Sequence, residues 1–319
     1  MESSSRVYVA GGETLIGSAI LRNLEKNGYT RLIGSAGEGP ELTDRAAVAA
    51  FFDEFRPEHV FFAGGKSGGI HANQKYPAEL ILDNLLAQCH VIHQAYLAGV
   101  KKLVCLASSC AYPRQSPQPI PPQALLTGIL EPTNEAYAVA KIAGLKLCQA
   151  YRRQYGVNFV SVIPANAFGP GDDFHLENSH VIAALLARMH QAKESGQESV
   201  EIWGTGNARR DFIYADDLAD ACVFVMQHYD GEEPINLGGG SGVSIRELAL
   251  MVKEVVGYKG ELRFDTTKPD GMPCKLLDST KLFALGWRPQ TPFRTALAET
   301  YQWYLHHVGK ERGIFSERS

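Results

Sequence analysis

Short apolar runs alternate with longer helical stretches over the first 163 residues, and this alternation constrains the fold more than any other feature of the chain. It predicts right-handed βαβ units on a parallel sheet, because consecutive parallel strands need a crossover helix between them. The expected strands are 6–10, 31–33, 59–63, 102–106 and 158–163, and the expected helices are 18–27, 44–55, 77–98 and 135–155. Gly28 and Gly156 are expected as left-handed helix caps, and Asn134 as an N-cap. The pattern predicts an α/β fold with a doubly wound parallel sheet.

A glycine-rich loop joins the first expected strand to the first expected helix. It reads Gly-Gly-Glu-Thr-Leu-Ile-Gly at 11–17. A helix that begins here could receive a pyrophosphate on its free N–H groups, as in Rossmann-type folds. The expected cofactor contacts are Gly11, Gly12, Glu13, Thr14, Leu15, Ile16 and Gly17. Thr14 stands where such loops usually have a middle glycine, and we expect its branched side chain to crowd the phosphate. The alternative is a simple strand-to-helix turn.

The loop after the second strand bears on the choice between NAD and NADP. An acidic residue at the end of this strand binds the ribose 2′-hydroxyl, whereas an arginine accommodates a 2′-phosphate. Residues 34–39 supply neither at that position, since Glu38 follows slightly too late. The cofactor preference therefore stays open on this pattern.

The second half of the chain, after Pro164, is less regular, with short elements separated by loops rich in Gly, Pro, Asp and Asn. Ser244 and Glu247 form an expected capping box, and Thr291 with Pro292 is expected to open the last helix. We expect a dinucleotide-binding domain over 1–163 and mainly a substrate-binding lobe over 164–319, with a segment near 211–237 returning to the first domain. A cleft between them is the expected ligand site.

Composition excludes several classes of protein. Hydrophobic residues make up 45% and charged residues 21% of the chain, and the formal net charge is −4, so we expect no nucleic-acid or membrane partner. The N-terminus lacks the basic and apolar regions of a signal peptide, which predicts a cytoplasmic protein. The six cysteines show no C-x-x-C spacing, so we expect reduced thiols and no metal site.

Tyr137 and Lys141 lie four residues apart on an expected helix, and therefore on one face of it. A nearby cation stabilises phenolate, so we expect Lys141 to lower the pKa of Tyr137 and prepare it for proton transfer to a carbonyl oxygen. This spacing is common on helix surfaces and is weak evidence by itself. Ser108 and Ser109 strengthen it, because they end the fourth expected strand at the edge where open α/β sheets bind ligands.

Longer motifs resemble one enzyme family. They are Gly-Gly-Ile at 68–70, Ser-Ser-Cys-Ala-Tyr-Pro at 108–113, Glu-Pro-Thr-Asn-Glu-Ala-Tyr-Ala-Val-Ala-Lys-Ile-Ala-Gly at 131–144, Asn-Ser-His-Val-Ile at 178–182, Trp-Gly-Thr-Gly-Asn at 203–207, Arg-Arg-Asp-Phe-Ile-Tyr at 209–214 and Lys-Pro-Asp-Gly at 268–271. Together they resemble the GDP-L-fucose synthase family, which belongs to the extended short-chain dehydrogenases/reductases. The resemblance covers nearly the whole chain.

The resemblance implies conversion of GDP-4-keto-6-deoxy-D-mannose to GDP-L-fucose by 3,5-epimerisation and NADPH-dependent reduction of the 4-ketone. It implies Tyr137 as proton donor, Lys141 as its electrostatic partner and ribose ligand, and Ser108 as a hydrogen-bond donor to the ketone. Cys110 and His180 match the acid/base pair of the epimerisation. Each has a structural alternative, since an isolated cysteine is most often a small buried hydrophobe and an isolated histidine often packs or caps.

The resemblance also assigns ligand contacts. Beyond the glycine loop, the implied cofactor contacts are Ser35, Ala63, Leu106, Ala107, Ser108, Lys141, Pro164, Asn166, Ala167 and His180. The implied substrate contacts are Arg188, Trp203, Arg210, Asp270 and Lys275, each of which could instead be structural. The family favours NADP(H), with NAD(H) not excluded, and implies a homodimer. Cys274 stands where the family commonly has a basic residue, which weakens the assignment of the nucleotide.

Other functions fit parts of the sequence. A 4,6-dehydratase would carry an Asp-Glu pair after Ser108, but Ser109 and Cys110 follow it. Another nucleotide-sugar 4-reductase or 4-epimerase would need only the Tyr137, Lys141 and Ser108 set. A non-catalytic dinucleotide sensor would explain the irregular glycine loop, but it has no use for the tyrosine–lysine pair.

Overall fold

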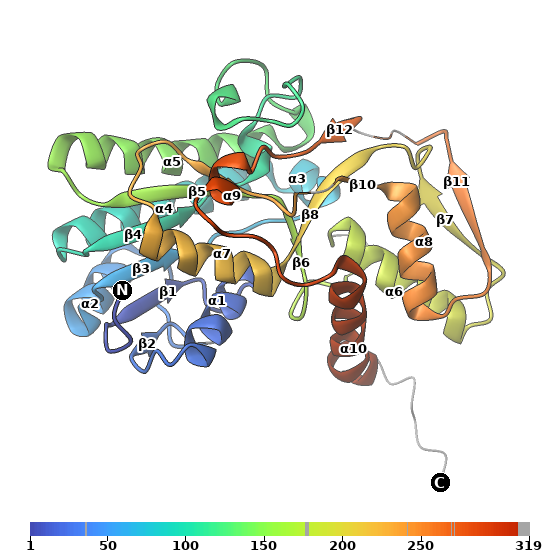
Figure 1. Cartoon of the computed structure of the whole chain (residues 1–319), viewed down its shortest axis with the longest axis horizontal. Coiled ribbons are helices and arrows are strands. Elements are labelled where there is room, and N and C mark those ends of the chain that lie inside the picture. The colour runs from blue at the N-terminus through green and yellow to red at the C-terminus, as the bar shows by residue number, and fades with distance from the viewer. Residues whose placement is uncertain (36, 176–178, 241, 269, 271, 312–319) are drawn as a thin grey trace, which may run out of the picture.

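A six-stranded sheet organises the first half of the molecule in the computed structural model, which describes residues 1–35, 37–175, 179–240, 242–268, 270 and 272–311 (Figure 1). Its strands, in spatial order, are β2 (Leu32–Ile33), β1 (Val7–Ala10), β3 (His59–Phe62), β4 (Lys102–Leu106), β5 (Phe159–Pro164) and β9 (Ile235–Leu237). Every neighbouring pair is parallel. The parallel α/β sheet predicted from the alternation is confirmed.

Helices cover both faces of this sheet. One face carries α1 (Leu15–Lys26) and α7 (Ala215–His228), and the other carries α2 (Arg45–Phe55), α4 (Pro77–Leu97) and α5 (Glu135–Tyr155). The two faces follow from the period of a strand, which sends alternate side chains to opposite sides. Val7 and Val9 of β1 pack in the core with α1 and α7, whereas Tyr8 packs in the core with α2 and α4.

The strand order reverses at β1, because the chain turns first to β2 on one side and then to β3 on the other. The loops that leave β1 and β3 therefore separate at the carboxyl edge of the sheet, where α/β folds bind their ligands. They also approach closely at their starts, since a β-carbon built on Gly11 would lie 2.4 Å from Cα of Gly64. This edge is the structural frame of the candidate site.

A second core lies in the smaller lobe. Strands β7 (Ser199–Trp203) and β11 (Glu261–Asp265) form a parallel pair, and β8 (Arg209–Tyr214) pairs with β6 (Asn166–Phe168), β10 (Gly242–Ser244) and β12 (Cys274–Lys275). The helices α6 (Val181–Glu194), α8 (Ile245–Val256) and α10 (Phe293–Glu311) enclose this core. The remaining short elements are α3 (Ile70–Lys75), α9 (Thr280–Ala284) and three 3₁₀ turns, η1 (Ser109–Ala111), η2 (Pro122–Ala124) and η3 (Pro132–Asn134).

Several helix ends can be compared with their predicted caps. The capping box is present, with the Glu247 amide 3.1 Å from the Ser244 hydroxyl and the Ser244 amide 2.8 Å from the Glu247 carboxylate. Gly156 ends α5 in the left-handed conformation. Asn134 is the N-cap residue of α5, as predicted, but its side chain makes no capping bond. Within the part of the chain that the structure describes, no helix is both long and apolar enough to cross a membrane.

Candidate active site

The glycine loop runs from β1 into α1 as predicted. Gly11 has φ of +85°, a left-handed conformation that favours glycine. A β-carbon built on Gly17 would lie 1.9 Å from the Gly11 carbonyl oxygen, so the two ends of the loop fit together only without a side chain at Gly17. The N-terminus of α1 thus opens from a tightly folded turn, which is the geometry that receives a pyrophosphate.

The Thr14 hydroxyl turns back onto its own loop, and the crowding of a phosphate by its side chain stays a prediction. Its hydroxyl donates to the Gly11 carbonyl at 2.8 Å and accepts from the Gly17 amide at 3.0 Å. Thr14 is therefore the N-cap of α1, which also explains why this helix begins at Leu15 rather than at Ser18. A glycine at this position would be more flexible, whereas the threonine side chain fixes the loop through two hydrogen bonds.

Ser108, Tyr137 and Lys141 come together although they lie on two different elements. Ser108 follows β4 and caps η1, while Tyr137 and Lys141 lie on α5. A hydrogen bond joins the side chains of Ser108 and Tyr137. The Lys141 ammonium lies 5.7 Å from the centre of the Tyr137 ring. The predicted reductase set is thus one cluster at the carboxyl edge of the sheet.

The electrostatics of this cluster differ from the sequence-based expectation. Burial raises the pKa of Tyr137 because a phenolate loses its hydration there, and the hydrogen bond with Ser108 only partly opposes this rise. Burial also lowers the pKa of Lys141. The expected lowering of the Tyr137 pKa by Lys141 is therefore not found, because desolvation by burial is the largest influence on this phenol. A tyrosine that keeps its proton at neutral pH is suited to donate it.

Cys110 lies beside this cluster, and two donors point at its sulfur. The Asn134 side-chain amide donates to Sγ at 3.2 Å, and the Lys275 ammonium lies 3.7 Å from the same atom. The sulfur also affects Tyr137, since negative charge on Cys110 raises the pKa of that phenol. Lys275 was predicted as a substrate contact, and the structure places it at the candidate acid/base cysteine.

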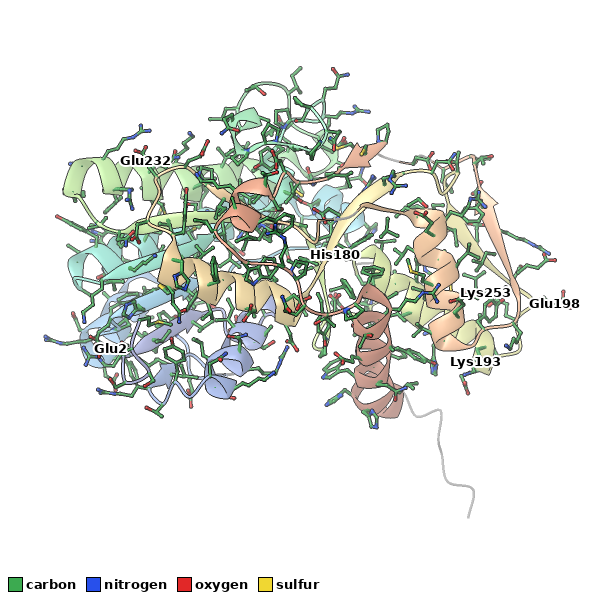
Figure 2. The ribbon with its side chains drawn as sticks, in the orientation of Figure 1. Glu2, His180, Lys193, Glu198, Glu232 and Lys253 are labelled. Atoms are coloured by element: carbon green, nitrogen blue, oxygen red, sulfur yellow. The ribbon has the colours of Figure 1, made fainter. Side chains whose placement is uncertain are left out.

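His180 precedes α6 and lies near the centre of the molecule (Figure 2). Its ring is partly open to solvent, yet desolvation by surrounding protein lowers its pKa. The positive charge of Lys275 lowers it further, whereas Asp173 raises it. Since Lys275 acts on both His180 and Cys110, the three side chains belong to one electrostatic neighbourhood. A histidine with a lowered pKa is neutral at pH 7 and can accept a proton.

The predicted substrate residues are only partly brought together. Arg210 on β8 donates to the main-chain carbonyls of Met272 and Asp270, and burial lowers its pKa. The Asp270 carboxylate accepts two bonds of 2.7 Å from Thr205, so its oxygens hold a turn of this lobe. Trp203 is 59% exposed, with the Lys268 ammonium 5.6 Å from its ring. Arg188 lies farther along α6 than His180.

The other predicted cofactor residues share one location. Each lies at or just beyond the carboxyl end of a strand that faces the same edge. Ser35 follows β2, Ala63 follows β3, Leu106 and Ala107 end and follow β4, Pro164 ends β5, and Asn166 and Ala167 begin β6. Parallel strands bring these ends together, which is why residues far apart in the chain can line one site.

Sequence reasoning missed Asn134 and Asn84 as parts of the site. Asn134 was taken for a helix cap, whereas its amide contacts Cys110. Asn84 is buried on α4, donates to the carbonyls of Lys66 and Leu80, and closes around Gly65. A β-carbon on Gly65 would lie 2.3 Å from Asn84 Oδ1 and 3.6 Å from the Lys141 ammonium. No local sequence pattern distinguishes these asparagines from others in the chain, so only the tertiary contacts identify them.

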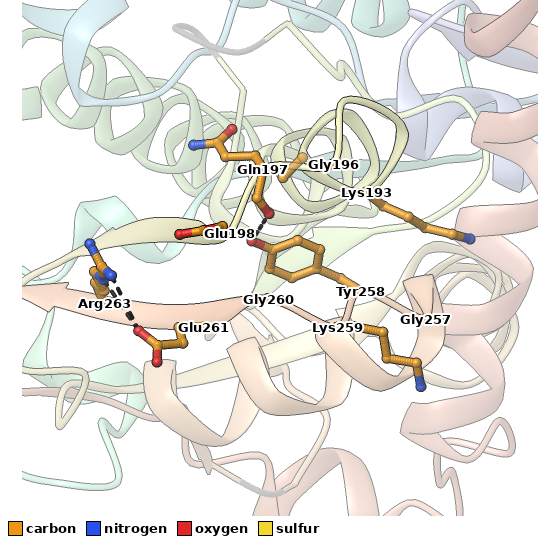
Figure 3. Close-up of a pocket in the computed structure, with 11 residues that line it drawn as sticks. Lys193, Gly196, Gln197, Glu198, Gly257, Tyr258, Lys259, Gly260, Glu261 and Arg263 are labelled. Atoms are coloured by element: carbon orange, nitrogen blue, oxygen red, sulfur yellow. Dashed lines mark hydrogen bonds and ion pairs between the residues drawn. The ribbon is translucent and has the colours of Figure 1, made fainter.

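A cavity of about 630 Å³ lies elsewhere, beside the carboxyl ends of α6 and α8 (Figure 3). Tyr258 donates to the Gln197 carbonyl across it, and Arg263 pairs with Glu261 at its rim. It contains none of the predicted site residues. Three residues of the family-like motifs, Asn178, Pro269 and Gly271, lie outside the described residues.

The fold and the cluster of Ser108, Tyr137 and Lys141 define a dinucleotide-dependent enzyme of the short-chain dehydrogenase/reductase class. A model of the NAD dependent epimerase/dehydratase family matches residues 7–238. GDP-L-fucose synthase 1 of Arabidopsis thaliana is 54% identical over 307 residues, covering 96% of this chain and 95% of the relative. The chain therefore belongs to the NAD dependent epimerase/dehydratase family and, within it, to the GDP-L-fucose synthases.

Two further relatives support this placement. GDP-L-fucose synthase of Escherichia coli is 45% identical over 320 residues, covering 98% of this chain and all of the relative. The crystal structure of a GDP-L-fucose synthetase from Naegleria fowleri, bound to NADP, superimposes with a TM-score of 0.89 at 29% identity. That comparison covers 97% of this chain and 96% of the other.

Proposed function

We propose that this protein converts GDP-4-keto-6-deoxy-D-mannose to GDP-L-fucose by 3,5-epimerisation followed by reduction of the 4-ketone. One observation carries the proposal: Cys110, with two donors at its sulfur, lies beside the Ser108 and Tyr137 pair. A reductase without epimerase activity needs only the Ser108 and Tyr137 pair. The presence of both in one cluster supports a site that moves protons at carbon and at the ketone oxygen.

A nicotinamide dinucleotide fits the carboxyl edge of the sheet. The turn of Gly11 and Gly17, capped by Thr14, would hold its pyrophosphate at the start of α1. When bound there, the dinucleotide supplies the hydride for the 4-ketone. The NADP in the Naegleria fowleri relative supports NADP(H) as the reductant. Lys141 would hold the ribose next to the nicotinamide.

Reduction places negative charge on the oxygen at carbon 4. Tyr137 donates a proton to this oxygen, since burial keeps the phenol protonated at neutral pH. The Ser108 hydroxyl, which neighbours Tyr137, donates its hydrogen bond to the same oxygen. The Lys141 ammonium lies 5.7 Å from the centre of the tyrosine ring and stabilises the phenolate that remains after the proton has been donated.

Epimerisation uses the same ketone before it is reduced. The ketone acidifies the protons on carbons 3 and 5, because an enolate can spread the charge to oxygen. One of Cys110 and His180 removes the proton, and the other returns one to the opposite face of the ring. Lys275 lies 3.7 Å from the Cys110 sulfur, and its positive charge also acts on His180.

Hydrogen exchange in heavy water tests the epimerase. The full-length protein is incubated with GDP-4-keto-6-deoxy-D-mannose and reduced dinucleotide, and the product is analysed by NMR. We expect deuterium on carbons 3 and 5, and its loss in Cys110→Ser. A product without deuterium at these carbons would show that the chain is a 4-reductase without epimerase activity.

The reductase half has its own test. Tyr137→Phe removes the donated proton but keeps the ring, so dinucleotide oxidation should fall by at least about 100-fold. Binding of the dinucleotide, measured by calorimetry, should change little. Deuterium should still enter carbons 3 and 5 in this variant, because exchange precedes reduction. Unchanged turnover would exclude Tyr137 as the donor.

The protein also forms a homodimer in the cytoplasm under this proposal. The packed pair α4 and α5 exposes large apolar side chains, among them Leu82, Leu97 and Tyr155, which are between 45% and 59% exposed. Dimerisation through these helices would cover them. Buried Cys105 and Cys148 touch as free thiols, which suits a reducing compartment. Leu82→Glu should give monomers by sedimentation, and an unchanged mass would place the interface elsewhere.

A further inference from the structure

Two loops meet at the adenosine end of the dinucleotide site. A β-carbon built on Gly12 would lie 1.8 Å from the carbonyl oxygen of Gly34, so the loop after β1 packs directly on the loop after β2. Glu13 follows Gly12 and its side chain is exposed. In folds of this type the end of β2 lies at the adenosine ribose of the dinucleotide. The close contact therefore brings the loop that carries Glu13 against the loop that follows β2.

Tyr8 gives independent evidence for this placement. Its side chain is 1% exposed, and its hydroxyl has no hydrogen-bond partner among the described residues. A β-carbon built on Gly39 would lie 3.9 Å from this hydroxyl, and one on Gly34 would lie 3.1 Å from the ring. The negative charge of Glu13 acts on the same hydroxyl, since it adds to the rise that burial causes in the pKa of Tyr8. Glu13, Tyr8, Gly34 and Gly39 thus lie around one point at the end of β2.

The charge around this point is negative. Residues 11–17 and 34–44 contain four carboxylates, at positions 13, 38, 41 and 44, and contain neither Lys nor Arg. Of the basic residues that flank these loops, Lys66 pairs with Asp83 at 2.5 Å and Arg22 pairs with Asp216 at 2.7 Å. Arg45 begins α2 just after the second loop. A 2′-phosphate calls for a cation at this point, whereas a 2′-hydroxyl calls for a carboxylate.

The pyrophosphate of a dinucleotide therefore fits this site, but a 2′-phosphate does not. We propose that Glu13 sets the dinucleotide specificity: its carboxylate accepts a hydrogen bond from the 2′-hydroxyl of the adenosine ribose and repels a 2′-phosphate, so that the protein binds NADH at least as tightly as NADPH. The inference rests on the proposed dinucleotide-dependent reduction and defines its reductant. It leaves NADPH usable but removes the selectivity for it.

Calorimetric titration of the full-length protein with NADH and with NADPH tests the proposal without any turnover. The wild-type Kd for NADPH should equal or exceed that for NADH. Glu13→Arg should shift the ratio of the two constants toward NADPH by about tenfold or more, because repulsion is replaced by a charge-assisted bond. Glu13→Gln should shift it less. Raising the salt concentration should reduce the difference between the wild-type Kd values for NADH and NADPH, because salt screens the repulsion between charges.

Glu25→Arg is the matched control, since Glu25 is exposed on α1 and the substitution makes the same change in net charge. It should leave the ratio of the two constants unchanged. The proposal is overturned if wild-type protein binds NADPH more than tenfold more tightly than NADH, or if neither Glu13 variant moves the ratio. Failure to bind either dinucleotide would instead overturn the proposed reductase function itself.

Discussion

Asn134→Ala tests whether the contact with Cys110 belongs to the chemistry. The substitution removes the amide that donates to the sulfur at 3.2 Å and leaves Lys275 as the remaining donor at 3.7 Å. The other end of the same amide, Asn134 Oδ1, is buried with no partner among the described residues. Removing the side chain therefore also removes a buried unsatisfied group, so we expect little change in folding stability.

The magnitude follows from the charge on the sulfur. A hydrogen bond to a charged group contributes about 1.5–3 kcal/mol, compared with about 0.5–1.5 kcal/mol for a neutral pair. At about 1.4 kcal/mol per tenfold change in rate, loss of a bond to a sulfur that becomes charged in the transition state slows proton abstraction by about 10- to 150-fold. Loss of a bond to a sulfur that stays neutral slows it by only about two- to tenfold.

Deuterium uptake at carbons 3 and 5, followed by NMR without reduced dinucleotide, measures proton abstraction alone. We expect uptake in Asn134→Ala to fall by at least tenfold. The pH dependence of the rate at which iodoacetamide alkylates Cys110 should shift toward higher pH. A merely structural role of Asn134 would not cause this shift. Thr133→Ala is the control, because Thr133 lies in the same 3₁₀ turn but bonds to Glu131 rather than to sulfur. Uptake within twofold of wild type would refute the role assigned to Asn134.

Three further outcomes follow from the contacts of single residues. Thr14→Ala removes the N-cap of α1 and should lower the free energy of unfolding by about 1 kcal/mol in urea titrations, whereas Thr14→Ser should lose little; equal loss in both would contradict the capping role. Burial raises the pKa of Asp172 to about 7, above its unfolded value of 3.8, so wild-type stability should fall as pH rises from about 4 to 7. Asp172→Asn should then be more stable at pH 8 by up to about 4 kcal/mol and nearly equal at pH 4; a difference that does not depend on pH would contradict this. Lys275→Met should slow deuterium uptake while Tyr137-dependent reduction of an already epimerised substrate continues, and equal loss of both rates would assign Lys275 to substrate binding alone.

Local sequence patterns were sufficient for the sheet and for the frame of the site. Alternation of short and long apolar segments specified the parallel strands, because period and length distinguish a buried strand from a helix within a few residues. The spacing of Tyr137 and Lys141 placed both on one face of α5, which depends on helix geometry alone. Ser108 could be placed at the carboxyl edge because it directly follows an apolar strand.

Only the tertiary structure decided the chemistry of these groups. The side chains of Asn134 and Lys275 both contact Cys110, although they lie 24 and 165 residues from it in the chain. Local sequence periodicity cannot predict contacts between residues so far apart. The pKa of Tyr137 rises rather than falls, because desolvation depends on everything packed around the phenol. In the same way, the contact of Gly12 with Gly34 brings together two loops that lie more than twenty residues apart in the chain. The sequence determined which helices and strands form. Packing determined which side chains contact one another and how far each is removed from solvent.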